Sequence, residues 1–153
     1  MALASSRRLI GASVDRVFSL ATQPERLPDW DPLFASVSGV QGPLDRVGAA
    51  FDAEMRIAGR RLRMRHTVTQ VQPGRALTIV GVGREGGRLT WTDQYTIAGT
   101  FGTQLERHLE YELPEGFADD FGERPSYRRD IENDLIRALD NLAVLAESKP
   151  LAV

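Results

Sequence analysis

The sequence contains no cysteine and only two histidines among its 153 residues. Disulfide frameworks, thiolate zinc sites and a cysteine nucleophile are therefore excluded, and a histidine-rich metal site is not expected. No stretch approaches the ~20 apolar residues of a membrane span, and the segment from Met1 to Val14 lacks the apolar run of a signal peptide. We expect a cytoplasmic protein with no metal, no cofactor and no stable membrane insertion.

Strong charge of one sign is also missing, because the net charge is −2. This balance disfavours a nucleic-acid partner. Hydrophobic residues make up 42% and charged residues 26%, which is ordinary for a soluble globular protein. The length suits one hydrophobic core, so we expect a single domain over residues 1–153 that is a monomer or a homodimer.

The two ends of the chain carry helical patterns. Ser13 is a good N-cap for a short helix that ends near Ala21, and the three prolines of segment 23–32 predict a kinked turn or a helix of one or two turns. Near the C-terminus an apolar stripe at helical spacing predicts a helix of about 20 residues, bounded by Pro125 and Pro150. The stripe consists of Ile131, Leu135, Ala138, Leu142 and Leu145, with Leu139 beside it.

The middle of the chain has a period of two. Ala2 to Ile10 reads as a weak strand, and about six more strands follow between Leu33 and Leu113 with one wet face each. A two-residue type II′ turn at Gly59-Arg60 would join two of them. That register places Ile57 opposite Leu62, Met55 opposite Met64, and Ala53 opposite His66.

Two charged residues interrupt the apolar alternation of the last two strands. Asp93 is in phase with Leu89, Trp91, Tyr95 and Ile97, and Arg107 is in phase with Leu105, Leu109 and Tyr111. A hairpin around Gly99 to Gly102, with Ile97 opposite Thr103, places Asp93 opposite Arg107. Because two unpaired charges in an apolar face are costly, we predict a cross-strand ion pair. It either satisfies itself or holds a carbonyl, phenol or carboxylate of a ligand.

These elements predict an α+β fold. A curved antiparallel sheet of about seven strands wraps around the long C-terminal helix, and two short helices follow the first strand. The space between sheet and helix is expected to form a cavity for a small apolar ligand.

Five segments of the chain resemble a known family. They are Ser13-Val-Asp-Arg-Val-Phe-Ser-Leu, Pro24-Glu-Arg-Leu-Pro-Asp-Trp-Asp-Pro, Val47-Gly-Ala-Ala-Phe, Val68-Thr-Gln-Val-Gln-Pro-Gly-Arg-Ala-Leu and Leu139-Asp-Asn-Leu-Ala-Val-Leu-Ala-Glu. The chain resembles the polyketide cyclase/dehydrase and lipid-transport group of the SRPBCC (START-like) superfamily. The resemblance implies a helix-grip fold and a hydrophobic ligand such as a polyketide, lipid or quinone. It does not choose between carriers and enzymes.

Three residues are candidates for catalysis: His66, Asp93 and Arg107. An imidazole is suited to acid–base work near neutral pH, although His66 also fits a core histidine bonded to a carbonyl or water. Phenols and aromatic rings on the predicted inner face could contact a ligand or simply pack. The full set of candidate ligand-binding residues is Trp30, Phe34, Met55, Met64, His66, Trp91, Asp93, Tyr95, Arg107, Tyr111, Tyr127, Ile131 and Leu135.

Polar motifs on the predicted outer face favour no second function. Arg61, Arg63 and Arg65 share one face, but acidic residues accompany them, so we interpret this face as a mixed charged surface. Gly81-Val-Gly-Arg-Glu-Gly is no dinucleotide site, because it leads into a strand and not into a helix. Three functions remain open: a binder of a small hydrophobic or aromatic molecule, a polyketide aromatase/cyclase-type enzyme, and, ranked lowest, a protein–protein interaction module.

Overall fold

The structure is a computed structural model, and it describes residues 2–117 and 126–148. The elements are β1 (Ala2–Ile10), α1 (Val14–Ala21), the 3-10 turn η1 (Pro24–Arg26), α2 (Leu27–Trp30), β2 (Phe34–Gln41), β3 (Ala50–Ile57), β4 (Arg60–Gln72), β5 (Ala76–Gly83), β6 (Arg88–Ala98), β7 (Gly102–Glu112) and α3 (Ser126–Glu147). The predicted order of strand, short helices, strand meander and long helix is confirmed. Pro125 and Pro150 lie outside the described residues.

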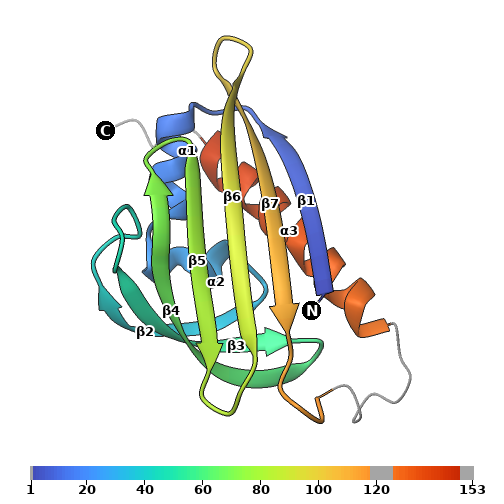
Figure 1. The fold of residues 1–153 in the computed structure, drawn as a ribbon. Helices are drawn as coiled ribbons and strands as arrows, with labels where there is room; N and C mark the ends of the chain where they lie inside the picture. The colour runs from blue at the N-terminus through green and yellow to red at the C-terminus, as the bar shows by residue number, and fades with distance from the viewer. Residues whose placement is uncertain (1, 118–125, 149–153) are drawn as a thin grey trace.

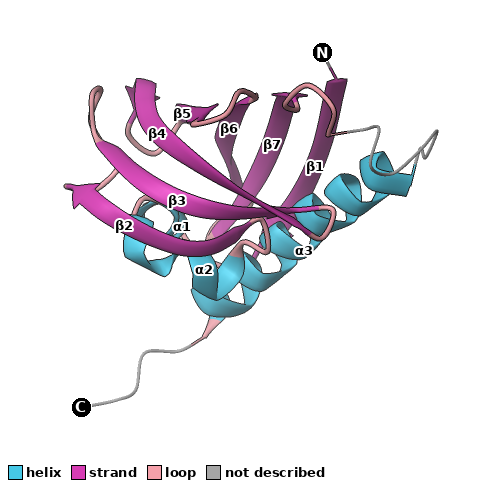
Figure 2. Cartoon of the chain, turned by 90° about the horizontal axis from the view of Figure 1, so that it is seen from below, coloured by secondary structure: helices cyan, strands magenta, loops and turns pink. Residues whose placement is uncertain are grey.

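One antiparallel sheet of seven strands holds the fold together, in the order β1-β7-β6-β5-β4-β3-β2. The first strand forms one edge of the sheet and pairs with the last strand, with Ala2 opposite Tyr111. Figure 1 shows the strands in front of α3, and Figure 2 shows the sheet curving over that helix, with α1 and α2 at one end. This is the helix-grip arrangement that the sequence predicts.

The long helix α3 packs mainly along β1 and touches α1 and α2. Its buried side chains follow a helical period and face the sheet: Ile131, Leu135, Ala138, Leu139, Leu142, Ala143 and Ala146. Leu145, expected in the stripe, is only partly buried. Ala146 takes the inward position one residue later, because the true stripe follows the 3.6-residue turn of the helix.

The two short helices form as their sequence predicts. The Ser13 hydroxyl accepts the Arg16 N–H at 3.3 Å and caps α1. A proline lies in the first turn of both η1 and α2, where the missing N–H of proline removes no helical hydrogen bond. The Asn141 amide of α3 donates to the Trp30 carbonyl at 3.1 Å, which ties the end of α2 to the long helix.

The β3–β4 hairpin departs from the predicted register. Ile57 pairs with Arg60, Met55 with Leu62, and Ala53 with Met64, two residues away from the expected partners. The prediction was wrong because Ala58, with φ +50°, joins Gly59, with φ +82°, in the turn. Positive φ at both central residues is the geometry of a type I′ turn, which Asn, Asp or Gly usually starts and Ala rarely does.

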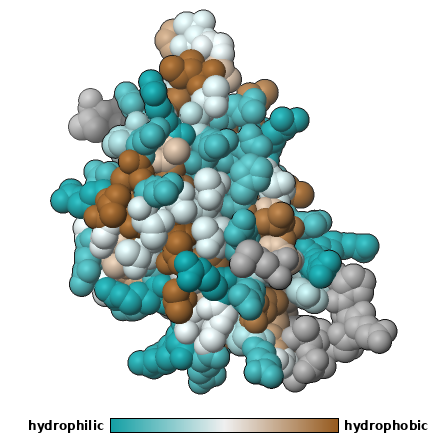
Figure 3. Space-filling view, viewed as in Figure 1, coloured by the Kyte–Doolittle hydropathy of each residue, from teal (hydrophilic) through white to brown (hydrophobic). Residues whose placement is uncertain are grey.

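The β6–β7 hairpin has the predicted register, with Ile97 opposite Thr103. Ile97 itself is 75% exposed and does not share the buried face, because it lies near the hairpin tip, beyond the end of the core. Figure 3 shows hydrophilic residues over most of the outer face of the sheet, with hydrophobic ones scattered among them. None of the helices in the described part of the chain is both long enough and apolar enough to cross a membrane.

Candidate functional site

A buried ion pair joins the last two strands. Asp93 lies opposite Arg107, and the guanidinium donates two hydrogen bonds to the carboxylate, from Nε to Oδ1 at 2.8 Å and from Nη2 to Oδ2 at 2.9 Å. Both side chains are almost fully buried. The predicted cross-strand ion pair is confirmed, and its two-pronged geometry is the strongest form of such a contact.

Sequence reasoning missed a third member of this cluster, Asp31. Its Oδ2 accepts Arg107 Nη1 at 2.8 Å, and its Oδ1 accepts the Leu33 N–H at 3.1 Å. The Trp30 ring lies 5.1 Å from the guanidinium carbon of Arg107. Asp31 follows α2 in a loop where no periodicity marks a residue as buried. The available signal was the Trp30-Asp31-Pro32 tripeptide, since an aspartate there can accept the N–H two residues later.

The pKa values of this triad reflect burial and mutual charge. Burial raises the pKa of Asp31, and the charge of Arg107 only partly opposes that shift. Burial by itself would lower the pKa of Arg107, but the charge of Asp93 and the hydrogen bonds to it raise it instead. Arg107 is therefore a permanent cation, and its hydrogen bonds to both aspartates tie β6, β7 and the α2 loop together.

The second feature of the interior is an aromatic cluster around His66. Phe51 stacks on the imidazole at 4.8 Å between ring centroids, and Trp91 and Phe34 lie at 5.2 and 5.3 Å. The ring fits because its β5 neighbour is Gly81. A Cβ at position 81 would lie 2.5 Å from Nδ1 and Cε1 of His66, closer than real contacts allow.

Several polar atoms on this inner face have no partner. Within the described residues, neither nitrogen of His66, nor Nε1 of Trp91, nor the Tyr95 hydroxyl makes a hydrogen bond, and the same holds for Nε1 of Trp30. Burial lowers the pKa of His66 to about 3, so the imidazole is neutral at pH 7. Burial, together with the charge of Asp93, raises the pKa of Tyr95 and keeps its phenol protonated.

The other predicted site residues belong to the same core, and most of them are apolar. The pKa of Tyr111 is raised by burial and by the neighbouring Tyr127 phenol. All predicted residues except Tyr127 are buried: Trp30, Phe34, Met55, Met64, His66, Trp91, Asp93, Tyr95, Arg107, Tyr111, Ile131 and Leu135. Phe51, which stacks on His66, was not among them. His108 is exposed beside Glu106, on the solvent face that the alternation predicts.

A surface hollow of about 500 Å³ lies between α2, the β3–β4 turn and α3, and Phe34 is the one residue of this cluster that lines it. Phe34 lines it together with Pro28, Pro32, Asp134 and Arg137. Phe34 is thus shared by the hollow and the cluster, in which its ring lies 5.3 Å from that of His66 and 5.6 Å from that of Trp91. In residues 2–117 and 126–148, no three His, Cys, Asp or Glu side chains converge as a metal site.

The model of the polyketide cyclase/dehydrase and lipid transport family matches residues 1–147. The chain belongs to this family. The fold agrees, because solved structures of an aromatase/cyclase and of a START superfamily protein share it. No curated protein sequence matches the chain at a significant level.

Three solved structures illustrate this likeness. An aromatase/cyclase from Streptomyces sp. R1128 has a TM-score of 0.74 at 13% identity, over 95% of this chain and 93% of its own. A protein from Thermus thermophilus has a TM-score of 0.74 at 19% identity, over 96% and 100% of the two chains. A START superfamily protein from Mycobacterium smegmatis has a TM-score of 0.67 at 16% identity, over 95% and 97%. At these low sequence identities the likeness shows a shared fold only.

Proposed function

We propose that the chain acts as one START-like domain that binds a small hydrophobic or aromatic molecule between the sheet and α3. The molecule carries at least one polar oxygen. Its apolar body packs on the rings of Phe34, Phe51 and Trp91. Its oxygen binds one of the polar groups that lack a partner within the described residues, which belong to His66, Trp91 and Tyr95. A polyketide, a quinone or a lipid with an oxygenated head has this chemistry.

The observation that carries the proposal is the set of buried polar atoms without partners. Leaving a buried donor or acceptor unsatisfied costs about 1–3 kcal/mol, so native interiors rarely contain several together. Within the described residues, His66 Nδ1 and Nε2, Trp91 Nε1 and the Tyr95 hydroxyl are all unsatisfied on one face of the sheet. A bound molecule that supplies both an apolar body and an oxygen would satisfy the one or two of them that lie within its reach.

The hollow beside α2 supports a route to this site. Phe34 lines the hollow, and its ring also contacts the rings of His66 and Trp91. Rotation of this one side chain would connect the hollow with the interior. Aromatic side chains turn about two χ angles, so such a movement needs no change of the backbone.

Binding is favoured over acid–base turnover by the state of the three catalytic candidates. An efficient general base has a pKa near the working pH. Burial lowers the pKa of His66 to about 3, which makes its imidazole a weak base at neutral pH. Asp93 and Arg107 engage one another with two hydrogen bonds. His66 is thus suited to orienting a ligand, and the charged pair to shaping the site.

The test compares two probes that differ by one hydroxyl, 2-naphthol and naphthalene. Fluorescence titration of the purified protein should show saturable binding of both, with 2-naphthol bound about five- to tenfold more tightly, as expected for one buried hydrogen bond. His66→Leu and Tyr95→Phe should reduce this preference. Phe101→Ala, at an exposed hairpin tip, should leave it unchanged.

Two results would count against the proposal. The first is an absence of saturable binding of either probe, and the second is an unchanged preference for the hydroxyl in both interior variants. Native mass spectrometry of the protein as purified adds an independent measurement. A lipid or quinone recovered by this route would support the carrier, whereas conversion of a bound poly-ketone would support the cyclase instead.

A further inference from the structure

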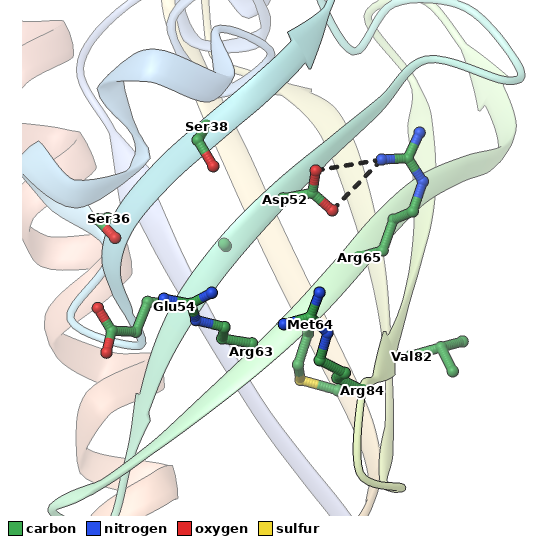
Figure 4. A pocket seen from close by; sticks show the side chains of 10 residues that line it. Ser36, Ser38, Asp52, Glu54, Arg63, Met64, Arg65, Val82 and Arg84 are labelled. Atoms are coloured by element: carbon green, nitrogen blue, oxygen red, sulfur yellow. Dashed lines mark hydrogen bonds and ion pairs between the residues drawn. The ribbon is translucent and has the colours of Figure 1, made fainter.

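A polar groove lies on the outer face of the sheet, on the side opposite the proposed ligand site. It has a volume of about 510 Å³ and crosses strands β2 to β5. Its lining includes Ser36 and Ser38 from β2, Asp52 from β3, Arg63 and Arg65 from β4, and Arg84 directly after β5. Figure 4 shows these side chains on one side of the strands. We call it the Arg63–Arg84 groove.

Two of the arginines near this groove have counter-ions. Arg65 Nη1 lies 3.3 Å from both oxygens of Asp52, and Arg61 Nη1 lies 3.3 Å from Glu54 Oε1. Asp52 also lies close against the β2 backbone, since a Cβ at Gly39 would lie 2.7 Å from its Oδ2. Both carboxylates of the groove are therefore already engaged.

Arg63 and Arg84 have no such partner. In the described part of the chain, no carboxylate forms an ion pair with either of them. The Arg84 N–H donates to the Arg63 carbonyl at 3.0 Å, which fixes the two residues side by side on adjacent strands. Like charges on neighbouring strands repel, and an anion between them removes that repulsion.

We propose that the Arg63–Arg84 groove binds a small multivalent oxyanion, a pyrophosphate or a phosphate ester. The guanidinium groups of Arg63 and Arg84 supply donors in the planar geometry that phosphate oxygens match. The hydroxyls of Ser36 and Ser38 supply further donors from the β2 wall. The site is separate from the interior, so its function does not depend on the proposed hydrophobic ligand.

The test is calorimetric titration of the folded protein with sodium pyrophosphate at low ionic strength. Arg63→Gln and Arg84→Gln should each weaken binding about fivefold or more, and the double variant should abolish it, because each removes a charged hydrogen-bonding group. Ser38→Ala should have a smaller effect, about two- to threefold. All of these side chains are exposed, so the variants should keep the wild-type melting temperature.

The matched control is the double variant Arg75→Gln/Arg129→Gln, which removes the same charge from exposed positions elsewhere. Its affinity should stay within about twofold of wild type, since neither side chain lines the groove and neither can donate a hydrogen bond to the anion. Equal loss of binding in the control, or no heat of binding in the wild type, would overturn the proposal. Phosphatidylcholine vesicles with and without phosphatidic acid test whether the bound phosphate belongs to a lipid headgroup or to a soluble molecule. Binding to the acidic vesicles that needs Arg63 and Arg84 would assign the phosphate to a lipid headgroup.

Discussion

The interior contains two polar clusters, which differ in whether their buried polar atoms have hydrogen-bond partners. In the charged cluster, Asp31, Asp93 and Arg107 meet at 2.8–2.9 Å and the second oxygen of Asp31 accepts a backbone N–H. In the aromatic cluster, His66 and Trp91 are as deeply buried, but neither imidazole nitrogen nor the indole N–H has a partner among the described residues. A hydrogen-bond network whose members are all satisfied holds its helices and strands in place, whereas buried donors and acceptors without partners can bind a polar ligand. We therefore assign the first cluster to the framework and the second to the ligand.

Removing the cation should have the largest effect on stability. Arg107→Met leaves two buried carboxylates facing each other, and breaking a buried ion pair from one side costs about 3–5 kcal/mol. The free energy of unfolding from urea titration measures this loss. The control is Arg65→Met, which breaks a half-exposed pair with Asp52 and should cost no more than about 1 kcal/mol. Similar losses in both variants would contradict a framework role for Arg107.

The histidine should produce an effect of intermediate size that depends on pH. The unfolded chain takes up a proton on His66 near pH 6.5, whereas the folded chain takes it up only near pH 3. The unfolded state thus binds more protons in this window, and the stability due to neutral His66 falls as the pH falls. The loss approaches about 1.4 kcal/mol per pH unit.

The measurement is the difference in unfolding free energy between wild type and His66→Leu from pH 7 to pH 4. The variant should become relatively more stable as the pH decreases. The raised pKa of Asp31 acts in the opposite direction, but it is present in both proteins and largely cancels. Parallel curves for the two proteins would show that the imidazole is not buried as a neutral group.

The smallest effect is expected from two buried hydroxyls. Thr103 Oγ1 donates to the Ala12 carbonyl at 2.8 Å, while the Tyr95 hydroxyl has no partner in the described residues. Thr103→Val should therefore lose about 1 kcal/mol, and Tyr95→Phe should be neutral or slightly stabilising without ligand. Thermal unfolding of the two variants checks the order. A larger loss in Tyr95→Phe would reveal that the phenol is already satisfied.

The sequence predicted those parts of the fold that depend on local pattern. Strict alternation and a short turn were enough to place Asp93 opposite Arg107, and helical spacing located α3. The β3–β4 register could not be predicted, because Ala58 adopts a left-handed conformation that its side chain does not favour. A turn shifted by one residue changes the pairing of the whole hairpin.

The candidate site was only partly predictable for a related reason. Inward-facing positions on strands follow from periodicity, so His66, Trp91 and Tyr95 were found. Asp31 lies in a loop, where burial depends on what the loop packs against and not on its own sequence. The space for the imidazole depends on Gly81, which is opposite His66 only because of the β4–β5 pairing. Such properties arise from contacts between distant segments.

The pairing of β1 with β7 has a consequence for how the chain folds during its synthesis. The residues of β1 find their neighbours only when residues 102–112 have been made, because Ala2 pairs with Tyr111 and Ile10 with Thr103. During synthesis this opening strand has no neighbour, and its backbone hydrogen bonds go to water. Pairing of β1 with β7 is thus a late, long-range step of the kind that slows folding.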